Sequence, residues 1–321
     1  MNGPATALWC EKHGTYGLRN ERIDTADHDI VVETAFSAVS KGTERLVLAG
    51  EIPASEFSRM RCPAQAGEFP FPVKYGYAAV GRIVSGPEAR LGGRVFALQP
   101  HQSMFALKAE EAIAVPDNVP SERAALAANM ETALNVVWDS GAAPCDNVVV
   151  VGCGVVGLLI ARLLARTPGV VVTAVDTDAS KRKAAEAMGA AFALPADAPE
   201  GADIAINASG RSEGLVCALA SAGREARVVE ASWHGTREAH LPLGGAFHSQ
   251  RLSIVSSQVG SLPPARAPRW TYKRRLTAAL SLLDDPALDA LLTHRVPLAE
   301  APDRLPALLA DPGALAILLT Y

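Results

Sequence analysis

An apolar segment that runs directly into a glycine-rich turn, VVVVGCGVVG, constrains the fold of this chain more than any other feature. Its glycines, Gly152, Gly154 and Gly157, have the spacing G-x-G-x-x-G. In a strand–turn–helix unit the first glycine permits the tight turn, the second lets the backbone approach a pyrophosphate, and the third lets the helix pack closely on the strand. The helix N-terminus adds free N–H groups. We therefore expect a dinucleotide to bind here, also through the amides of Val155 and Val156.

A carboxylate at the end of the next apolar segment predicts which dinucleotide binds. Asp176 lies nineteen residues beyond Gly157, close to the usual separation in this motif. Such a carboxylate accepts hydrogen bonds from a ribose 2′-OH and repels a 2′-phosphate. Lys181, Arg182 and Lys183 follow it; they either soften this preference, with Arg182 contacting the cofactor, or form the solvated face of a helix. The sequence favours NAD(H) over NADP(H).

The chain around this motif alternates between short apolar segments and helical segments, which predicts a parallel sheet buried on both faces. The expected strands are 147–152, 170–176, 202–210, 226–232 and 251–260, with helices at 154–167, 179–188 and 212–222. Residues 1–117 instead contain short β-like segments broken by Gly and Pro, which is typical of a β-barrel.

Connecting and terminal segments complete the expected organisation. A helix is predicted over 121–141 with Ser121 as its N-cap, and the proline-rich segment 261–270 is expected to be an irregular hinge. The tail predicts helices at 272–285 and 298–311 and a final strand at 314–321.

Composition excludes several classes of function. The 321 residues are 49% hydrophobic, enough to build the large cores of two domains. A net charge of −4 argues against a nucleic-acid partner. The longest apolar run contains three glycines and is shorter than the ~20 residues that span a bilayer. The five scattered cysteines indicate reduced thiols, and the N-terminus resembles no export signal, so we expect a cytoplasmic protein.

Several short segments resemble the medium-chain dehydrogenase/reductase superfamily: SKGTE at 40–44, GYAAVG at 76–81, RLSIVSSQVG at 251–260 and LLTHRVP at 291–297. Within it they are similar to the branch of bacteriochlorophyllide a dehydrogenase-like proteins. The resemblance implies an α/β protein with a GroES-like β-barrel catalytic domain and a Rossmann doubly wound parallel sheet. The domains expected are 1–127 (catalytic), 128–259 (NAD-binding) and 260–321 (returning to the catalytic domain). We expect a small-molecule substrate and a homodimer.

The same resemblance predicts that the chain lacks the superfamily's catalytic zinc. Its three ligand positions correspond here to Lys41, Tyr77 and, approximately, Ala128. Protein zinc sites use Cys, His or carboxylate ligands. The segment 94–116 also lacks the four cysteines of a structural zinc lobe. We expect no metal.

Without zinc, hydrogen-bond donors must stabilise the reacting oxygen. The resemblance places Tyr77, Lys41 and Thr43 at the catalytic centre, with Glu44 at the substrate pocket. An ammonium near Tyr77 would lower the pKa of the phenol. The alternative is that Tyr77 only fills space while Lys41 pairs with Glu44.

Other candidate residues lie outside these motifs, several of them directly after predicted strands. His101 lies in a polar loop and is either an acid/base group or a structural histidine; Trp233 either walls the substrate pocket or packs between domains. The resemblance places the segments NASG and SSQV around the nicotinamide. The remaining candidates are Thr132, Ala208, Ser209, Ser232 and Ser257 for the cofactor and Met130 for the substrate.

The predicted function is zinc-independent, NAD(H)-dependent interconversion of a secondary alcohol and a ketone on a biosynthetic intermediate. One alternative is NAD(P)H-dependent reduction of an activated C=C bond, as in quinone or enoyl reductases. Those enzymes usually prefer NADPH, against which Asp176 argues. The other alternative is a catalytically silent nucleotide-binding homologue.

Overall fold

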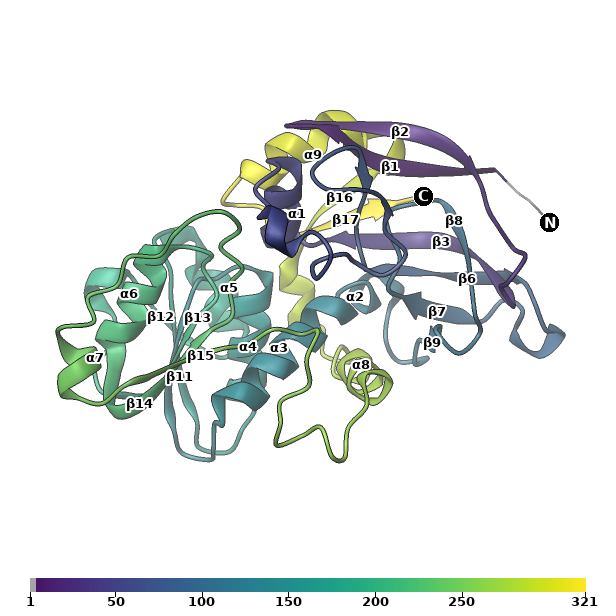
Figure 1. The fold of residues 1–321 in the computed structure, drawn as a ribbon. Coiled ribbons are helices and arrows are strands. Elements are labelled where there is room, and N and C mark those ends of the chain that lie inside the picture. The colour runs from purple at the N-terminus through teal and green to yellow at the C-terminus, as the bar shows by residue number, and fades with distance from the viewer. Residues whose placement is uncertain (1–3) are drawn as a thin grey trace. The chain divides into compact units, whose positions relative to one another are not determined.

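The computed structural model describes residues 4–321, which divide into two compact units (Figure 1). Unit 1 comprises residues 4–128 and 276–321, and unit 2 comprises Asn129–Arg275. The first boundary lies one residue from the expected one, whereas residues 260–275 group with unit 2 and not with the returning segment.

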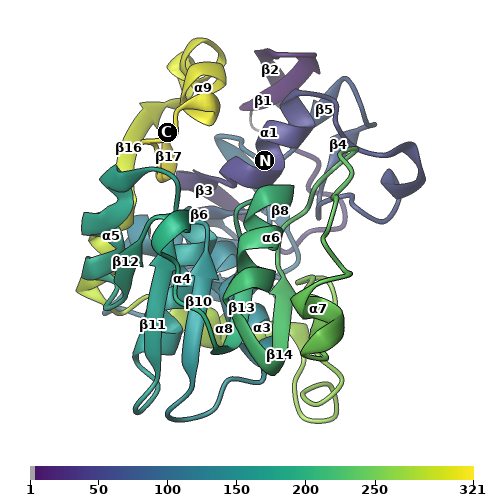
Figure 2. The same cartoon turned by 90° about the vertical axis from the view of Figure 1, so that its left-hand side faces the viewer.

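Unit 2 contains one six-stranded sheet in which every pairing is parallel (Figure 2). The strand order is β12-β11-β10-β13-β14-β15, so the chain winds outward from β10 in both directions. This is the predicted doubly wound sheet, and the fold class is confirmed. The strands are β10 (Asn147–Val151), β11 (Val171–Val175), β12 (Ala191–Ala193), β13 (Ala202–Asn207), β14 (Ala222–Glu230) and β15 (Ser253–Ser256).

Helices cover the sheet of unit 2 and explain why its central strands β10 and β13 are apolar over most of their length. Val149, Val228 and Leu215 belong to one buried cluster between β10, β14 and α6. Leu158 and Leu159 of α4 are completely buried as well. The helices are α3 (Ala127–Ser140, which begins in unit 1), α4 (Val155–Ala165), α5 (Arg182–Ala187), α6 (Ser212–Ser221) and α7 (Ala246–Ser249). Parallel strands buried on both faces do not alternate in polarity.

Unit 1 contains two sheets whose pairings are antiparallel except between β16 and β17. The larger sheet has the order β16-β17-β3-β6-β7-β9, with β8 also paired to β3, and the smaller has β2-β1-β5-β4. The strands are β1 (Pro4–Lys12), β2 (Thr15–Arg22), β3 (Ile30–Val39), β4 (Ala66–Gly67), β5 (Val73–Lys74), β6 (Ala79–Ser85), β7 (Arg94–Ala97), β8 (Met104–Leu107), β9 (Ile113–Ala114), β16 (Leu292–Pro297) and β17 (Ala316–Thr320).

The core of unit 1 lies against the strands of the larger sheet. Ile30, Val32, Ile83 and Phe105 are at most 3% exposed and belong to one cluster. The helices are α1 (Lys41–Leu48), α2 (Ser121–Ala124), α8 (Tyr272–Ser281, which begins in unit 2) and α9 (Ala301–Ala310). Because β17 pairs with β3, the tail of the chain completes the sheet that its first part begins.

The expected helix over 121–141 is wrong in detail, because the structure forms α2 and α3 with a break at Ala125 and Leu126. Pro120 is the N-cap of α2, so Ser121 is the first helical residue and not the cap. Proline is favoured near helix starts, where its missing N–H has no intrahelical partner.

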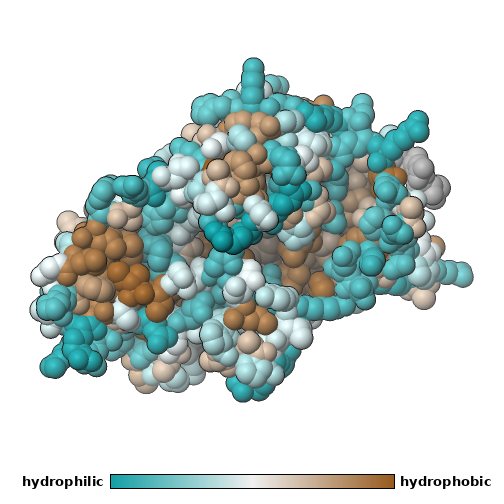
Figure 3. Space-filling model, in the orientation of Figure 1, coloured by the Kyte–Doolittle hydropathy of each residue, from teal (hydrophilic) through white to brown (hydrophobic). Residues whose placement is uncertain are grey.

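The surface in Figure 3 is mainly hydrophilic, with apolar side chains gathered near α6 and α7. Among residues 4–321, none of the helices combines the length and the apolar character that a bilayer crossing needs. The expected cellular location and homodimeric state are not tested by these observations and stay predictions.

Candidate functional site

The glycine turn of unit 2 has the geometry of a nucleotide-binding turn. Gly152 has φ +102°, and a Cβ added there would lie 2.6 Å from the amide nitrogen of Ser209. A Cβ on Gly157 would lie 1.9 Å from the carbonyl oxygen of Gly152. By contrast, a Cβ built on Gly154 would meet no described atom of another segment within 4 Å. The fold therefore requires the first and third glycines, and the second borders open space.

This open space lies at the N-terminus of α4. Gly154 is the N-cap of that helix and carries no side chain to satisfy the first amides. The N–H groups of Val155 and Val156 lie in the first turn, where a helix offers no acceptors of its own. A pyrophosphate fits this position, because its oxygens accept from such amides and its charge suits the helix dipole.

Asp176 is held beside the glycine turn by backbone amides. One carboxylate oxygen accepts from the N–H of Cys153 at 2.7 Å, and the other accepts from that of Asp178 at 2.9 Å. The carboxylate is therefore fixed at the carboxyl end of β11, where a ribose hydroxyl is expected. The guanidinium of Arg182 lies 4.8 Å from the ring centre of Phe192 on β12, and its expected contact with the cofactor stays a prediction.

Two further polar residues organise the carboxyl ends of β13 and β14. The side chain of Asn207, completely buried, donates to Oε2 of Glu230 at 2.7 Å and accepts from the hydroxyl of Ser209 at 2.7 Å. Oε1 of Glu230 accepts from the amide of Ser232 at 2.7 Å, and the Ser232 hydroxyl accepts from the amide of Gly210 at 2.9 Å. The predicted residues Ser209 and Ser232 are thus brought together. Sequence analysis did not identify Glu230 as the residue that fixes Asn207 and Ser232. Its position near the end of an apolar strand could have indicated this role.

The other predicted cofactor and substrate residues differ in their contacts and in their burial. The Ser257 hydroxyl donates to Asp139 at 2.6 Å, and burial raises the pKa of that carboxyl. The amide of Ala208 donates to the carbonyl of Val151 at 2.8 Å, which ties β13 to β10. Thr132 and Met130 both lie on α3, but Met130 is only 1% exposed and belongs to the core.

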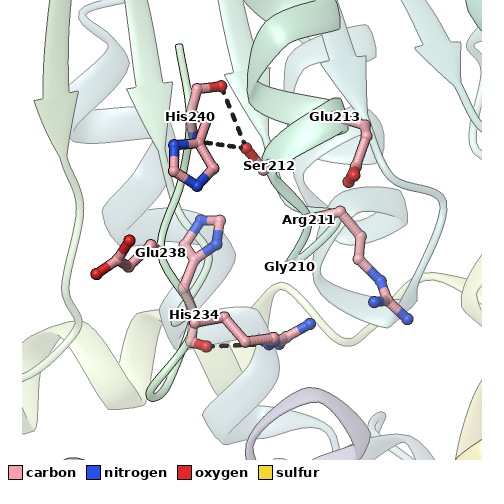
Figure 4. A pocket seen from close by; sticks show the side chains of 8 residues that line it. Gly210, Arg211, Ser212, Glu213, His234, Glu238 and His240 are labelled. Atoms are coloured by element: carbon pink, nitrogen blue, oxygen red, sulfur yellow. Dashed lines mark hydrogen bonds between the residues drawn. The ribbon is translucent and has the colours of Figure 1, made fainter.

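A cavity of about 420 Å³ lies at the same ends of β13 and β14. Figure 4 shows His234 and His240, from the segment after β14, on one side and Arg211 and Glu213, at the start of α6, on the other. His234 lies 3.4 Å from Glu230. Its neighbour Trp233 is half-buried. The lining carries charges of both signs, so it selects no single class of ligand.

In unit 1, His101 is the centre of a buried hydrogen-bond chain. Its side chain is 1% exposed, with Nδ1 2.7 Å from the Ser37 hydroxyl and Nε2 3.0 Å from Oε2 of Glu44. The Ser37 hydroxyl is in turn 2.6 Å from the phenol of Tyr321. The histidine therefore has both ring nitrogens occupied by protein partners.

The series of hydrogen bonds continues from Glu44 toward Tyr77. Oε1 of Glu44 accepts from the amide of Ser40 at 2.7 Å. The Tyr77 phenol donates to the Ser40 hydroxyl at 2.5 Å and lies 3.4 Å from the Thr43 hydroxyl. The structure thus brings together four of the predicted residues: Tyr77, Thr43, Glu44 and His101. Sequence analysis assigned no role to Ser37, Ser40 or Tyr321; Ser40 is the first residue of the quoted motif SKGTE, whereas Tyr321 gave no signal.

The expected lowering of the Tyr77 pKa by Lys41 is wrong. Burial raises the pKa of Tyr77 to about 12, and the hydrogen bonds from the phenol to Ser40 and Thr43 offset this only in part. The ammonium of Lys41 instead donates to the carbonyl oxygens of Asp311 and Ala314. The alternative pairing of Lys41 with Glu44 is replaced by the bond from Glu44 to His101.

The residues at the zinc-ligand positions do not fit zinc. Lys41 is engaged by carbonyls, Tyr77 is bonded to Ser40, and Ala128 is a buried alanine at the start of α3. Across residues 4–321 no three or more His, Cys, Asp or Glu side chains are grouped so that they would hold a metal ion.

Comparison with known proteins gives relatives of the whole chain. No family model matches it. It is 27% identical over 332 residues to 2-desacetyl-2-hydroxyethyl bacteriochlorophyllide A dehydrogenase of Cereibacter sphaeroides, covering 93% of this chain and 92% of that protein.

Three solved structures illustrate the similarity of fold. L-idonate 5-dehydrogenase from Escherichia coli has a TM-score of 0.81 at 13% identity, covering 100% of this chain and 99% of that one. A protein described as a short chain alcohol dehydrogenase from E. coli, complexed with NADH, has a TM-score of 0.78 at 19% identity, covering 99% of each chain. TarJ of S. aureus, in complex with NADPH, has a TM-score of 0.75 at 12% identity, again covering 99% of each.

These neighbours agree with the strand order of the two units and with the nucleotide-binding turn: all indicate a dehydrogenase fold. The chain therefore shares the fold of these dehydrogenases, as the resemblance seen in the sequence implies.

Proposed function

We propose that the chain is a zinc-independent, NAD(H)-dependent oxidoreductase that interconverts a secondary alcohol and a ketone on a small biosynthetic intermediate. The observation that carries this proposal is the turn of unit 2, where open space at Gly154 adjoins the fixed carboxylate of Asp176. The names of the similar proteins support the use of a nicotinamide cofactor, since they include dehydrogenases and complexes with NADH and with NADPH, while the preference for NAD(H) is proposed from Asp176 alone.

Within unit 2 different residues are proposed to bind different parts of the cofactor. The first-turn amides of α4 bind the pyrophosphate, and Asp176 accepts from the adenosine ribose. Ser209 and Ser232, fixed by Asn207 and Glu230, offer hydroxyls at the carboxyl edge of the sheet. A bound nicotinamide supplies or accepts the hydride.

Within unit 1 the Tyr77 phenol is the group proposed to bind the substrate oxygen. With a pKa of about 12 it is protonated near neutral pH, so it acts as a neutral hydrogen-bond donor. Because the phenol donates to Ser40 in this structure, the Ser40 hydroxyl must turn and donate to Tyr77 before the phenol O–H can donate a hydrogen bond to the substrate oxygen. Donors aimed at an oxygen that gains charge in the transition state accelerate such reactions.

Zinc independence is proposed from the chemistry of the side chains. An ammonium held by carbonyls, a neutral phenol and an alanine are not the Cys, His or carboxylate ligands of zinc. In this proposal a hydrogen bond from Tyr77, in place of a zinc ion, stabilises the charge that develops on the substrate oxygen.

Transfer of deuterium from NADH deuterated at C4 tests the reaction class. Ketones, quinones and enones are offered to the purified protein, and the position of deuterium in the product is read by NMR. Deuterium on a carbinol carbon is the expected result. Deuterium on the β-carbon of an enone would instead identify a C=C reductase, and tight NADH binding without transfer to any acceptor would identify a silent homologue.

A further inference from the structure

Ser40 occupies the N-cap position of α1 but does not use its hydroxyl as a cap. An N-cap serine normally accepts a hydrogen bond from an amide of the first turn, which stabilises the helix. Within residues 4–321, no such bond from the Ser40 side chain is formed. The hydroxyl is instead 2.5 Å from the Tyr77 phenol. The helix gives up a stabilising contact, and Tyr77 gains a partner.

The backbone of Ser40 is held by the carboxylate of Glu44. Oε1 of Glu44 accepts from the Ser40 amide at 2.7 Å, so a side chain four residues further along the helix satisfies the amide of the N-cap residue. Ser40 is 8% exposed, so its orientation is set by protein contacts and not by water. Its amide is thus fixed by one residue while its hydroxyl serves another.

Glu44 is itself anchored. Its side chain is 3% exposed, and its second oxygen is 3.0 Å from His101. His101 is bonded in turn to Ser37, and Ser37 to Tyr321. A buried carboxylate needs such partners to offset the cost of leaving water. The series of contacts therefore runs from β3 and the loop before β8, through α1, to the phenol.

We propose that Ser40 is a positioning residue: its hydroxyl orients the Tyr77 phenol, and Glu44 with His101 fixes the Ser40 backbone. The catalytic meaning of the orientation rests on the proposed function, whereas the coupling of Ser40 to Tyr77 does not.

NMR of the full chain labelled with ¹³C at the tyrosine Cζ tests the coupling without any substrate. The chain has five tyrosines, and Tyr77→Phe assigns the resonance of Tyr77. Ser40→Ala is expected to move that resonance at neutral pH, and Ser40→Thr, which keeps a hydroxyl, is expected to restore it. The matched control is Ser140→Ala, which removes a buried hydroxyl from α3 in unit 2. An unchanged Tyr77 resonance in Ser40→Ala would overturn the proposal.

Turnover supplies the second readout. Ser40→Ala removes no helix cap bond, and both Ser40→Ala and Ser140→Ala remove one buried hydroxyl that makes a hydrogen bond. The two variants are therefore expected to have similar melting temperatures. The kcat of Ser40→Ala is expected to fall about 10- to 100-fold, the lower part of the range for acid–base groups, with an unchanged KM. Ser40→Thr should recover most of it. Wild-type kcat in Ser40→Ala, despite a shifted resonance, would overturn the positioning role. Failure of the wild type with every substrate would count against the proposed function alone, and the NMR result would still decide the coupling.

Discussion

Nε2 of His101 lies 3.0 Å from Oε2 of Glu44, and neither side chain is more than 3% exposed. The two residues come from different parts of unit 1, the loop before β8 and helix α1. This burial favours the structural alternative for His101 over an acid/base group, and it places the Glu44 side chain inside unit 1. In the arrangement proposed above, the two residues support Ser40, whose hydroxyl is bonded to the Tyr77 phenol.

The first prediction concerns this pair. His101→Leu leaves the buried Glu44 carboxylate and the Ser37 hydroxyl without their partner, so unfolding by urea should show a loss of about 3 kcal/mol. His101→Gln, which keeps a hydrogen-bonding group, should lose roughly half as much. Equal stability of wild type and His101→Leu would mean that the pair contributes nothing to the fold.

Tyr77→Phe removes one hydroxyl and keeps the ring. If the phenol binds the substrate oxygen, kcat should fall by roughly 10²–10⁴ while the melting temperature and NADH affinity change little. The matched control is Tyr272→Phe, whose phenol is bonded to the Gly260 carbonyl on an exposed side chain. Full activity of Tyr77→Phe would reduce Tyr77 to a space-filling residue.

Lys41→Met is expected to affect stability and not the chemistry. The ammonium is bonded to the carbonyls of Asp311 and Ala314, so its removal should cost on the order of 1 kcal/mol in stability. The dependence of kcat on pH should stay as in the wild type. A displaced pH profile would indicate that Lys41 does tune Tyr77, against the contacts described above.

Asp176→Ala tests the choice of cofactor. The wild type should bind NADH more tightly than NADPH, because a carboxylate at this position repels a 2′-phosphate. Asp176→Ala should narrow or reverse the ratio of the two dissociation constants. Asp178→Ala is the matched control, since that carboxylate accepts from the Ser180 amide and begins the following helical turn. A wild type with equal affinities would contradict the role given to Asp176.

The fold of unit 2 was predictable because its signals are local. Apolar segments such as 147–152 and the glycine spacing after them identify strand, turn and helix without knowledge of distant residues. The break between α2 and α3 was not predicted, because the apolar pattern continues through Ala125 and Leu126.

The site was predictable only in part, since its contacts join residues far apart in the chain. Tyr77 and Glu44 were identified from the resemblance, but the bond from Ser37 to Tyr321 spans 284 positions and left no trace in either segment. The direction of the Lys41 side chain was missed for the same reason: its acceptors lie 270 or more residues away.

Zinc content and turnover, measured on the same preparation, test most directly whether this protein transfers hydride without a metal. The protein is purified without added metal, its zinc is determined by mass spectrometry, and kcat is measured before and after treatment with a chelator. We predict well under one zinc per chain and the same kcat in both states. Stoichiometric zinc, together with activity that the chelator removes and added zinc restores, would contradict the proposal that this protein transfers hydride without a metal.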